Sequence, residues 1–534
     1  NRLLMKLLQK DFFAILLIII IINVGLFSSC RKHPSLKPQQ PSNQDTFGIS
    51  TTTDEDSLKY LMYNIMQKSF VNSGRDTSYD LPTYYWYNQV PSFSPFSTQY
   101  ANADSLLALI KTYPKWNGQT VDRYSFLDRT GQIAGQIQNG VVDGNFMGLG
   151  SKGSFGLEVT YVTDNQNNSH LVVLYADKNS PAGQAGIQRG WEITSVNGNS
   201  NMAYDGPSGP NVTRIENAIY NSNTVTLTLL NLDGSSVTTT LNAAQYDINP
   251  ILFDTIYVRN NKKIGYFVFY IFSSVEDDNG APTNTKTILD NEFDKLSSAG
   301  INDLIVDLRY NEGGAVTTAE YLDSAIAPAS AQGKVMYQYS YNDKLTQVTS
   351  QLGLENQVLF PGGGSMHLDH VFFIVSRSTA SASELTLNNL KPYMDVKLVG
   401  DTTYGKPVGF IDFTINDYPN GSKKYLADLY AIDFATKNAN GVGDYFNGIP
   451  PDVEAIDYVN ISWGDPSDDN LSKIFNYITT GSFLRTYSQE RLVNKPNLLR
   501  VSPEFFIRSN QFNGMIDYRL GKELENGLRN MRKK

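Results

Sequence analysis

Short apolar runs and helix-like segments alternate along the second half of the chain. The runs at 264–272, 303–310, 371–376 and 396–400 have the length and residue content of buried strands. Between them, the residues at 285–300, 317–327 and 383–390 have helical composition and spacing. This alternation predicts βαβ units, and hence a mostly parallel sheet flanked by helices.

The pattern differs in the first half of the chain. Five short β-like runs between 154 and 243 surround the glycine-rich stretch 179–190, which predicts a compact β module with one short helix. Earlier, apolar residues at helical spacing predict a helix from Thr53 or Asp54 through Gln67, and a second helix at 103–113. The helical face of the first consists of Leu58, Leu61, Met62, Ile65 and Met66.

These patterns indicate a multidomain chain of α/β and β class. The predicted parts are a leader at 1–29, a flexible linker at 30–53 and a helical N-terminal domain at 54–150. A β module at 151–245, an α/β core at 246–465 and a helical C-terminal extension at 466–534 follow.

The N-terminal region predicts attachment to a membrane. A basic stretch, an unbroken apolar run and the small residues "SSC" resemble a lipoprotein signal peptide that is cleaved before Cys30, the acceptor of the lipid. The alternative is an uncleaved anchor helix, but the apolar run is shorter than the roughly 20 residues that span a bilayer. We therefore expect a lipid-anchored protein of the cell envelope that faces the periplasm or the exterior.

Composition changes this picture in two ways. The net charge is −9 and no basic stripe stands out, which argues against a nucleic-acid partner. Cys30 is the one cysteine of the chain, so an intrachain disulfide is excluded.

Three predicted strands end in residues that suit acyl transfer. Gly313 and Gly314 follow one strand, Ser381 follows the next, and Lys406 follows a third. Sites in α/β sheets form at the carboxyl ends of strands, where these residues supply a nucleophile, backbone N–H donors and a cation. The alternatives are that Ser381 only caps a helix and that Lys406 is a surface lysine.

A serine nucleophile requires a base, and the chain has four histidines. His33 lies in the linker and His170 in the β module, whereas His367 and His370 precede their strand and so lie at its wrong end. A buried lysine can act instead, because burial disfavours its ammonium form. His367 and His370 have no evident carboxylate or cysteine partner, so no metal site is predicted. Ser378 and Ser383 are interpreted as turn or cap residues.

The segment "STASASE", with "GDTTYGKP" carrying Lys406 25 residues after Ser381, resembles the C-terminal processing peptidases, which are tail-specific Ser/Lys proteases. The resemblance implies a ClpP/crotonase-like protease core, with Ser381 as nucleophile and Lys406 as general base. It also implies an oxyanion hole from the amides of Gly313 or Gly314 and of Ala382. No metal or organic cofactor is implied.

Other segments agree with this resemblance, which covers roughly 120–460. Residues 122–128, 264–269 and 447–455 match motifs of the family, and 180–198 resembles its PDZ motif. A PDZ-like module would bind peptides through the amides of Gly156 and Leu157, although "GSFGLEV" is also an ordinary strand entry. The substrates implied are peptides or proteins, bound by their C-terminal tails.

Two departures from the family pattern bear on activity. Phe410 stands where the family often has an orienting Gln, and Lys391-Pro392 replaces its Gln-Asp. Glu384 is retained, either as an orienting group or as a first-turn helix charge. The alternatives to an active protease are a non-catalytic peptide-binding lipoprotein and a crotonase-type acyl-CoA enzyme.

Overall fold

The computed structural model describes residues 53–142, 153–164, 166, 168–483, 498–506 and 514–533. Residues 46–534 belong to one compact unit. The predicted leader, Cys30 and most of the predicted linker lie outside the described residues. Among the described helices, none has the length and apolar content needed to cross a membrane.

The core of the protein is a six-stranded sheet with the order β11-β12-β13-β17-β18-β21. The strands from β12 onward are parallel to one another, and β11 pairs antiparallel with β12. This confirms a mixed α/β class, and every residue of β13 is buried, as expected for a covered parallel strand. The strands are β11 (Ile251–Arg259), β12 (Lys262–Phe269), β13 (Asp303–Asp307), β17 (His370–Val375), β18 (Val396–Gly400) and β21 (Val453–Glu454).

Three helices of this core occupy the connections that the sequence predicts. They are α7 (Asn284–Ala299), α8 (Val316–Ile326) and α10 (Ala382–Leu390). A fourth helix, α11 (Asp469–Thr480), follows β21 and was not predicted individually. The helix α9 (Asp343–Leu352) and the strands β15 (Val335–Tyr341) and β16 (Gln357–Leu359) lie between α8 and β17 in the chain.

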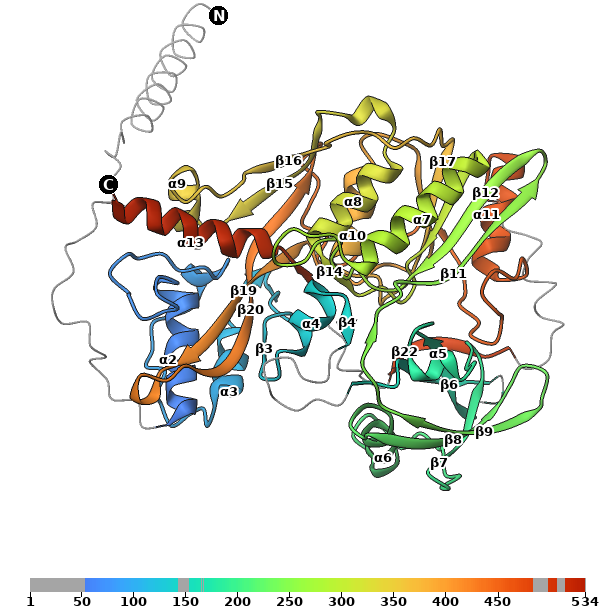
Figure 1. Ribbon diagram of the computed structural model, residues 1–534, viewed down its shortest axis with the longest axis horizontal. Coiled ribbons are helices and arrows are strands. Elements are labelled where there is room, and N and C mark those ends of the chain that lie inside the picture. The colour runs from blue at the N-terminus through green and yellow to red at the C-terminus, as the bar shows by residue number, and fades with distance from the viewer. Residues whose placement is uncertain are drawn as a thin grey trace, which may run out of the picture. The chain divides into compact units, whose positions relative to one another are not determined.

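A second sheet joins segments that are far apart in the sequence. Its order is β14-β23-β19-β20-β15-β16, and β3 also pairs with β20. Its remaining strands are β3 (Phe126–Asp128), β14 (Gly313–Ala315), β19 (Val408–Asp417), β20 (Lys424–Asn438) and β23 (Gly514–Ile516). The C-terminal helix α13 (Tyr518–Lys533) packs on α9 and β19 (Figure 1).

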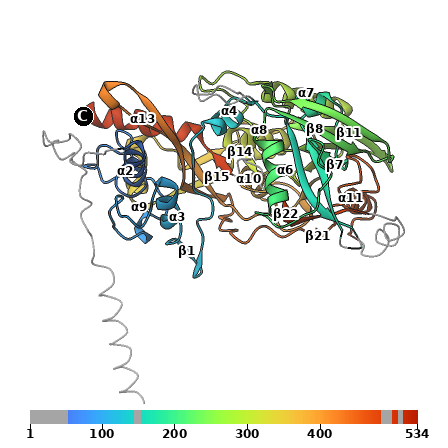
Figure 2. The ribbon, with the colours of Figure 1, turned by 90° about the horizontal axis from the view of Figure 1, so that it is seen from below.

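The N-terminal helices share a hydrophobic core with this second sheet. The helices are α2 (Asp54–Gln67), α3 (Ala103–Ile110) and α4 (Gln132–Gln138), and Thr53 caps α2 by accepting from the Asp56 amide. Leu61 and Leu106 belong to the same buried cluster as Leu429 of β20. Figure 2 shows α2 and α3 in blue beside the orange strands. Short strands accompany them: β1 (Lys115–Trp116), β2 (Gln119–Thr120), β4 (Val141–Val142) and β10 (Tyr246–Asp247).

The β module forms a third sheet with the order β22-β5-β6-β7-β8-β9. Most of its strands were predicted: β5 (Leu157–Thr163), β6 (Ser169–Ala176), β7 (Glu192–Val196), β8 (Thr224–Leu230) and β9 (Ser236–Asn242). The helices α5 (Pro181–Gln184) and α6 (Pro210–Tyr220) accompany them. The edge strand β22 (Arg500–Phe506) comes from the C-terminal extension, which therefore contains strands as well as helices.

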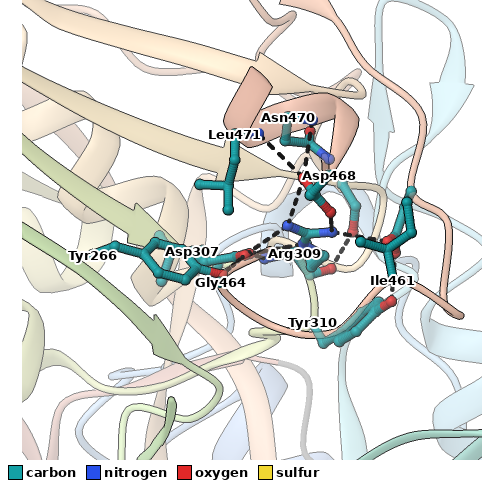
Figure 3. A network of polar contacts seen from close by, with 12 residues as sticks. Tyr266, Asp307, Arg309, Tyr310, Ile461, Gly464, Asp468, Asn470 and Leu471 are labelled. Atoms are coloured by element: carbon teal, nitrogen blue, oxygen red, sulfur yellow. Dashed lines mark hydrogen bonds and ion pairs between the residues drawn. The ribbon is translucent and has the colours of Figure 1, made fainter. Parts of the chain in front are cut away.

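A buried arginine fixes the end of β13. The Arg309 guanidinium donates to Asp307, Asp457 and Asp468, at 2.8, 2.9 and 3.0 Å (Figure 3). Asp468 is also the N-cap of α11, where its side chain accepts from the amides of Asn470 and Leu471. A buried charge is tolerated when it is fully paired in this way. The three ion pairs also hold Arg309 in place, and with it the start of the turn that follows β13.

Candidate active site

Ser381 lies at the N-terminus of α10, in a turn that holds it in an unusual conformation. Its backbone has φ 58° and ψ −106°, and the residue is fully buried. Such a φ is uncommon for a residue other than glycine and persists only where the surroundings enforce it. The Oγ atom has no hydrogen-bond partner among the described residues.

The turn that carries Ser381 is bound to the turn after β13. The Thr379 hydroxyl donates to the Leu308 carbonyl at 2.8 Å, and the Ala380 amide donates to the Asn311 carbonyl at 3.1 Å. The Ser383 hydroxyl also donates to the Asn311 carbonyl, at 3.1 Å. Ser383 thus helps to tie the two turns together.

Glu384 joins the Ser381 turn to the loop that carries Lys406. Its carboxylate accepts from the amides of Ser381, Gly405 and Lys406 at 2.9, 2.7 and 2.8 Å, and from the Thr403 hydroxyl at 2.5 Å. The Tyr404 amide also donates to the Thr379 carbonyl at 2.9 Å. Glu384 is thus more than a first-turn helix charge.

The Lys406 side chain is buried against aromatic rings. Its Nζ atom lies 3.9 Å from the centroid of the Phe410 ring and 5.1 Å from that of Tyr124. Burial holds the pKa of Lys406 well below its usual value, although the carboxylates of Asp122 and Glu384 act in the opposite direction. The lysine is therefore not a surface residue, and Phe410 contacts the ammonium where the family often has Gln.

The glycine strand β14 lies against the Ser381 turn. A Cβ atom on Gly313 would lie 3.1 Å from both the Ala380 carbonyl oxygen and the Ala382 nitrogen. Gly313 and Gly314 have φ values of 107° and 142°, which favour glycine. The Gly313 amide donates to the Asn311 side chain at 2.9 Å.

Three groups at the site, Arg123, Tyr124 and Glu312, were not singled out from the sequence as functional. Arg123 donates through Nη2 to the carbonyls of Tyr404, Gly405 and Phe446 at 3.0, 3.2 and 3.1 Å, and the Tyr124 hydroxyl donates to the Gly405 carbonyl at 2.6 Å. Arg123 and Tyr124 lie in the segment 122–128, whose resemblance to a family motif could have pointed to them. Burial raises the pKa of Glu312 to about 7, and the charge of Lys406 opposes this shift. No sequence pattern pointed to Glu312.

The other candidate residues lie apart from these. Gly156 has φ 66°, and its amide donates to the Ser154 hydroxyl at 3.0 Å, directly before Leu157 begins β5. His370 begins β17, and its Nδ1 atom lies 2.6 Å from the buried Asp303 carboxylate. His370 is therefore at the opposite end of the strand from Ser381.

The chain is similar to known proteases. The model of the family described as peptidase family S41 matches residues 263–455. The carboxyl-terminal-processing peptidase 3 of Arabidopsis thaliana chloroplasts is 24% identical over 321 residues, which cover 58% of this chain and 54% of that protein. The carboxy-terminal processing protease CtpA of Bacillus subtilis is 27% identical over 303 residues, covering 56% of this chain and 57% of that protein.

The chain spans about half the length of these curated relatives. A solved structure described as an S41 protease of Bacteroides fragilis has a TM-score of 0.54 and 21% identity, and covers 75% of this chain and 95% of that chain. That likeness shows a shared fold.

Proposed function

We propose that the chain is a serine endopeptidase of the C-terminal processing peptidase family, within peptidase family S41, with Ser381 as nucleophile and Lys406 as general base. One observation carries the proposal. A buried serine in a strained turn and a buried lysine with a lowered pKa belong to two loops that share the Glu384 carboxylate.

The proposed reaction passes through an acyl-enzyme. The neutral Lys406 amine takes the proton from the Ser381 hydroxyl as Oγ attacks the scissile carbonyl carbon. The resulting ammonium returns the proton to the leaving amine as the C–N bond breaks. Water, deprotonated by the same lysine, then attacks the ester, and Ser381 recovers its proton as the new C-terminus leaves.

The negative charge that develops on the carbonyl oxygen needs backbone donors. We assign this role to the Ala382 amide in the first turn of α10 and to the backbone amide of Gly313 or Gly314 in the neighbouring strand β14. The positive end of the α10 dipole favours the same charge. Donors fixed in advance are worth more in a buried site than in water, since they need no reorganisation during the reaction.

The β module is assigned as a PDZ-like domain that binds the substrate. An extended peptide would add to β5 as a strand, with its terminal carboxylate near the amides of Gly156 and Leu157. The substrates would be unstructured peptides or proteins bound through C-terminal tails. In this assignment the domains keep the limits 54–150, 151–245, 246–465 and 466–534.

We further assign the protein to the cell envelope, anchored by a lipid on Cys30 after removal of 1–29. Metabolic labelling with a fatty acid should mark the wild type, and Cys30→Ser should carry no label. A labelled Cys30→Ser protein would exclude Cys30 as the acceptor.

Hydrolysis of β-casein tests the catalytic assignment. Wild type should cleave it, and Ser381→Ala should lose activity by at least about 1,000-fold. Ser378→Ala, a buried serine of the same turn, is the matched control and should remain active. Full activity in Ser381→Ala would overturn the assignment, and a folded but inactive wild type would favour a peptide-binding protein without catalysis.

A further inference from the structure

One segment of the C-terminal extension reaches both the β module and the strand of the catalytic glycines. β22 pairs antiparallel with β5, at the edge of the module's sheet. Farther along the chain, β23 pairs in parallel with β14, aligning Gly514 with Gly313. Figure 1 shows β22 in red beside the green strands of the module.

β22 runs along β5 in the direction expected for a bound peptide. Arg500 pairs with Thr163 and Phe506 with Thr160, so the segment proceeds toward the end of β5 at which Gly156 lies. A peptide with its carboxylate near Gly156 would also be antiparallel to β5 and would use the same backbone groups. The segment and the peptide cannot occupy this edge together.

The pairing of β22 is weak. Its register contains Arg500, Val501 and Phe506, with a shift between Val501 and Phe506. Pro503 lies within this shift and has no N–H to donate, which is typical of edge strands and bulges. Few backbone hydrogen bonds to β5 therefore need to break for β22 to leave this edge.

β23 is held much more firmly. Met515 and Ile516 are fully buried, and Asp517 directly after them accepts from Arg519 at 2.8 Å and from Tyr339. The following helix α13 packs on α9 and β19. One end of the segment is thus anchored in the core while the other occupies a displaceable edge.

We propose that β22 is an intramolecular competitor of the substrate, which a peptide must displace from β5 before the module can bind it. This inference rests on the proposed function, since it takes β5 as the peptide-binding edge. An occupant joined to its site by a short connection acts at an effective concentration on the order of millimolar. Weakly binding peptides would be excluded, and peptides that pair well with β5 would be admitted.

A proline at position 500 should release this competitor selectively. The neighbouring Leu499 and Val501 form backbone hydrogen bonds with Val459 and Asp457 on the other side of the strand. Backbone groups alternate in direction along a strand, so the Arg500 amide faces Thr163 of β5. The Arg500 side chain is exposed, so Arg500→Pro removes one inter-strand donor and little packing.

Peptide binding to a catalytically dead protein gives the test. The probe is a fluorescein-labelled ten-residue peptide that ends in Leu-Ala-Ala, and its Kd is measured by fluorescence anisotropy with Ser381→Ala. In Ser381→Ala/Arg500→Pro, the Kd should fall by at least fivefold. The matched control is Ser381→Ala/Val237→Pro, which alters β9 at the opposite edge of the same sheet and should not lower the Kd.

A second variant tests the opposite direction and does not depend on the folding of Arg500→Pro. Pro503→Val supplies a backbone N–H and should strengthen β22, so the Kd should rise by at least threefold in the Ser381→Ala background. Unchanged affinity in both variants, or binding to none of the proteins, would overturn the proposal. Because these proteins are inactive by design, the result is independent of whether the wild type hydrolyses β-casein.

Discussion

The backbone amides of Ser381 and Lys406 donate to the same carboxylate oxygen, Oε2 of Glu384, at 2.9 and 2.8 Å. One side chain therefore fixes the relative position of the proposed nucleophile and the loop of the proposed base. Lys406 is held in this way through its backbone, while its side chain contacts aromatic rings.

Replacing Glu384 should disturb both loops at once. In Glu384→Ala the four donors that it satisfies lose their acceptor, and each unsatisfied buried donor costs about 1–3 kcal/mol. We expect kcat on a short peptide to fall by about 100-fold, together with a lower Tm. Glu525→Ala, an exposed glutamate of α13, is the control and should change neither. Wild-type kcat in Glu384→Ala would contradict this role.

The acid limb of the pH profile should report Lys406. Only the neutral amine can accept a proton, so kcat/KM on a short peptide should rise with pH through the lowered pKa of Lys406. Because the ordinary pKa of lysine is about 10.4, a rise that is complete by about pH 9 indicates a depressed value. A profile that is identical in Lys406→Arg would remove the lysine from this role.

Phe410 should tune that limb in two directions. Its ring attracts the ammonium, a contact worth about 0.5–2 kcal/mol, so Phe410→Leu should lower the pKa of Lys406 and move the limb to lower pH by up to about 1.5 units. Phe410→Gln offers a polar partner to the ammonium and should move the limb to higher pH. Phe413→Leu, on the same strand, is the control and should leave the profile in place.

Glu312 should affect the same limb by its charge. Its pKa of about 7 means that it ionises as the pH rises through neutrality, and its carboxylate then favours the Lys406 ammonium. Glu312→Gln removes that charge, so the pKa of Lys406 should fall and the limb should move to lower pH. A shift to higher pH would contradict this assignment.

Arg123 should act by positioning the Lys406 loop. Its guanidinium donates to three carbonyls, which a lysine ammonium cannot reproduce with the same geometry. Arg123→Lys should lower kcat on a short peptide by about 10- to 100-fold with little change in KM. Arg129→Lys, at an exposed ion pair with Glu55, is the control. Unchanged kcat in Arg123→Lys would show that the loop is held without it.

The site was predictable where its signals are local in sequence. Ser381 and Lys406 each lie six residues after the end of an apolar strand, β17 and β18 respectively. Glu384 lies in the first turn of the helix after Ser381. The α/β core was predictable for the same reason, because its strands and helices alternate along the chain.

The second sheet could not be predicted in this way. β20 is buried over most of its length, so it lacks the alternation that marks a half-exposed strand. β23 has three residues, and its partner β14 lies far back in the sequence. Apolar periodicity tells which face of a segment is buried, but not which distant segment covers it. The helix α6 was missed because its buried positions, such as Ile215, lie among polar residues.

The pairing of β14 with β23 also determines when this part of the structure can form during protein synthesis. Gly514 pairs with Gly313, from which it is separated by 201 positions of the chain. At about 5–20 residues per second of synthesis, roughly 10–40 s pass between the emergence of the two strands. The sheet beside Ser381 cannot close until the later strand has been made. A nascent chain would therefore contain Ser381, the proposed nucleophile, before the sheet beside it is complete.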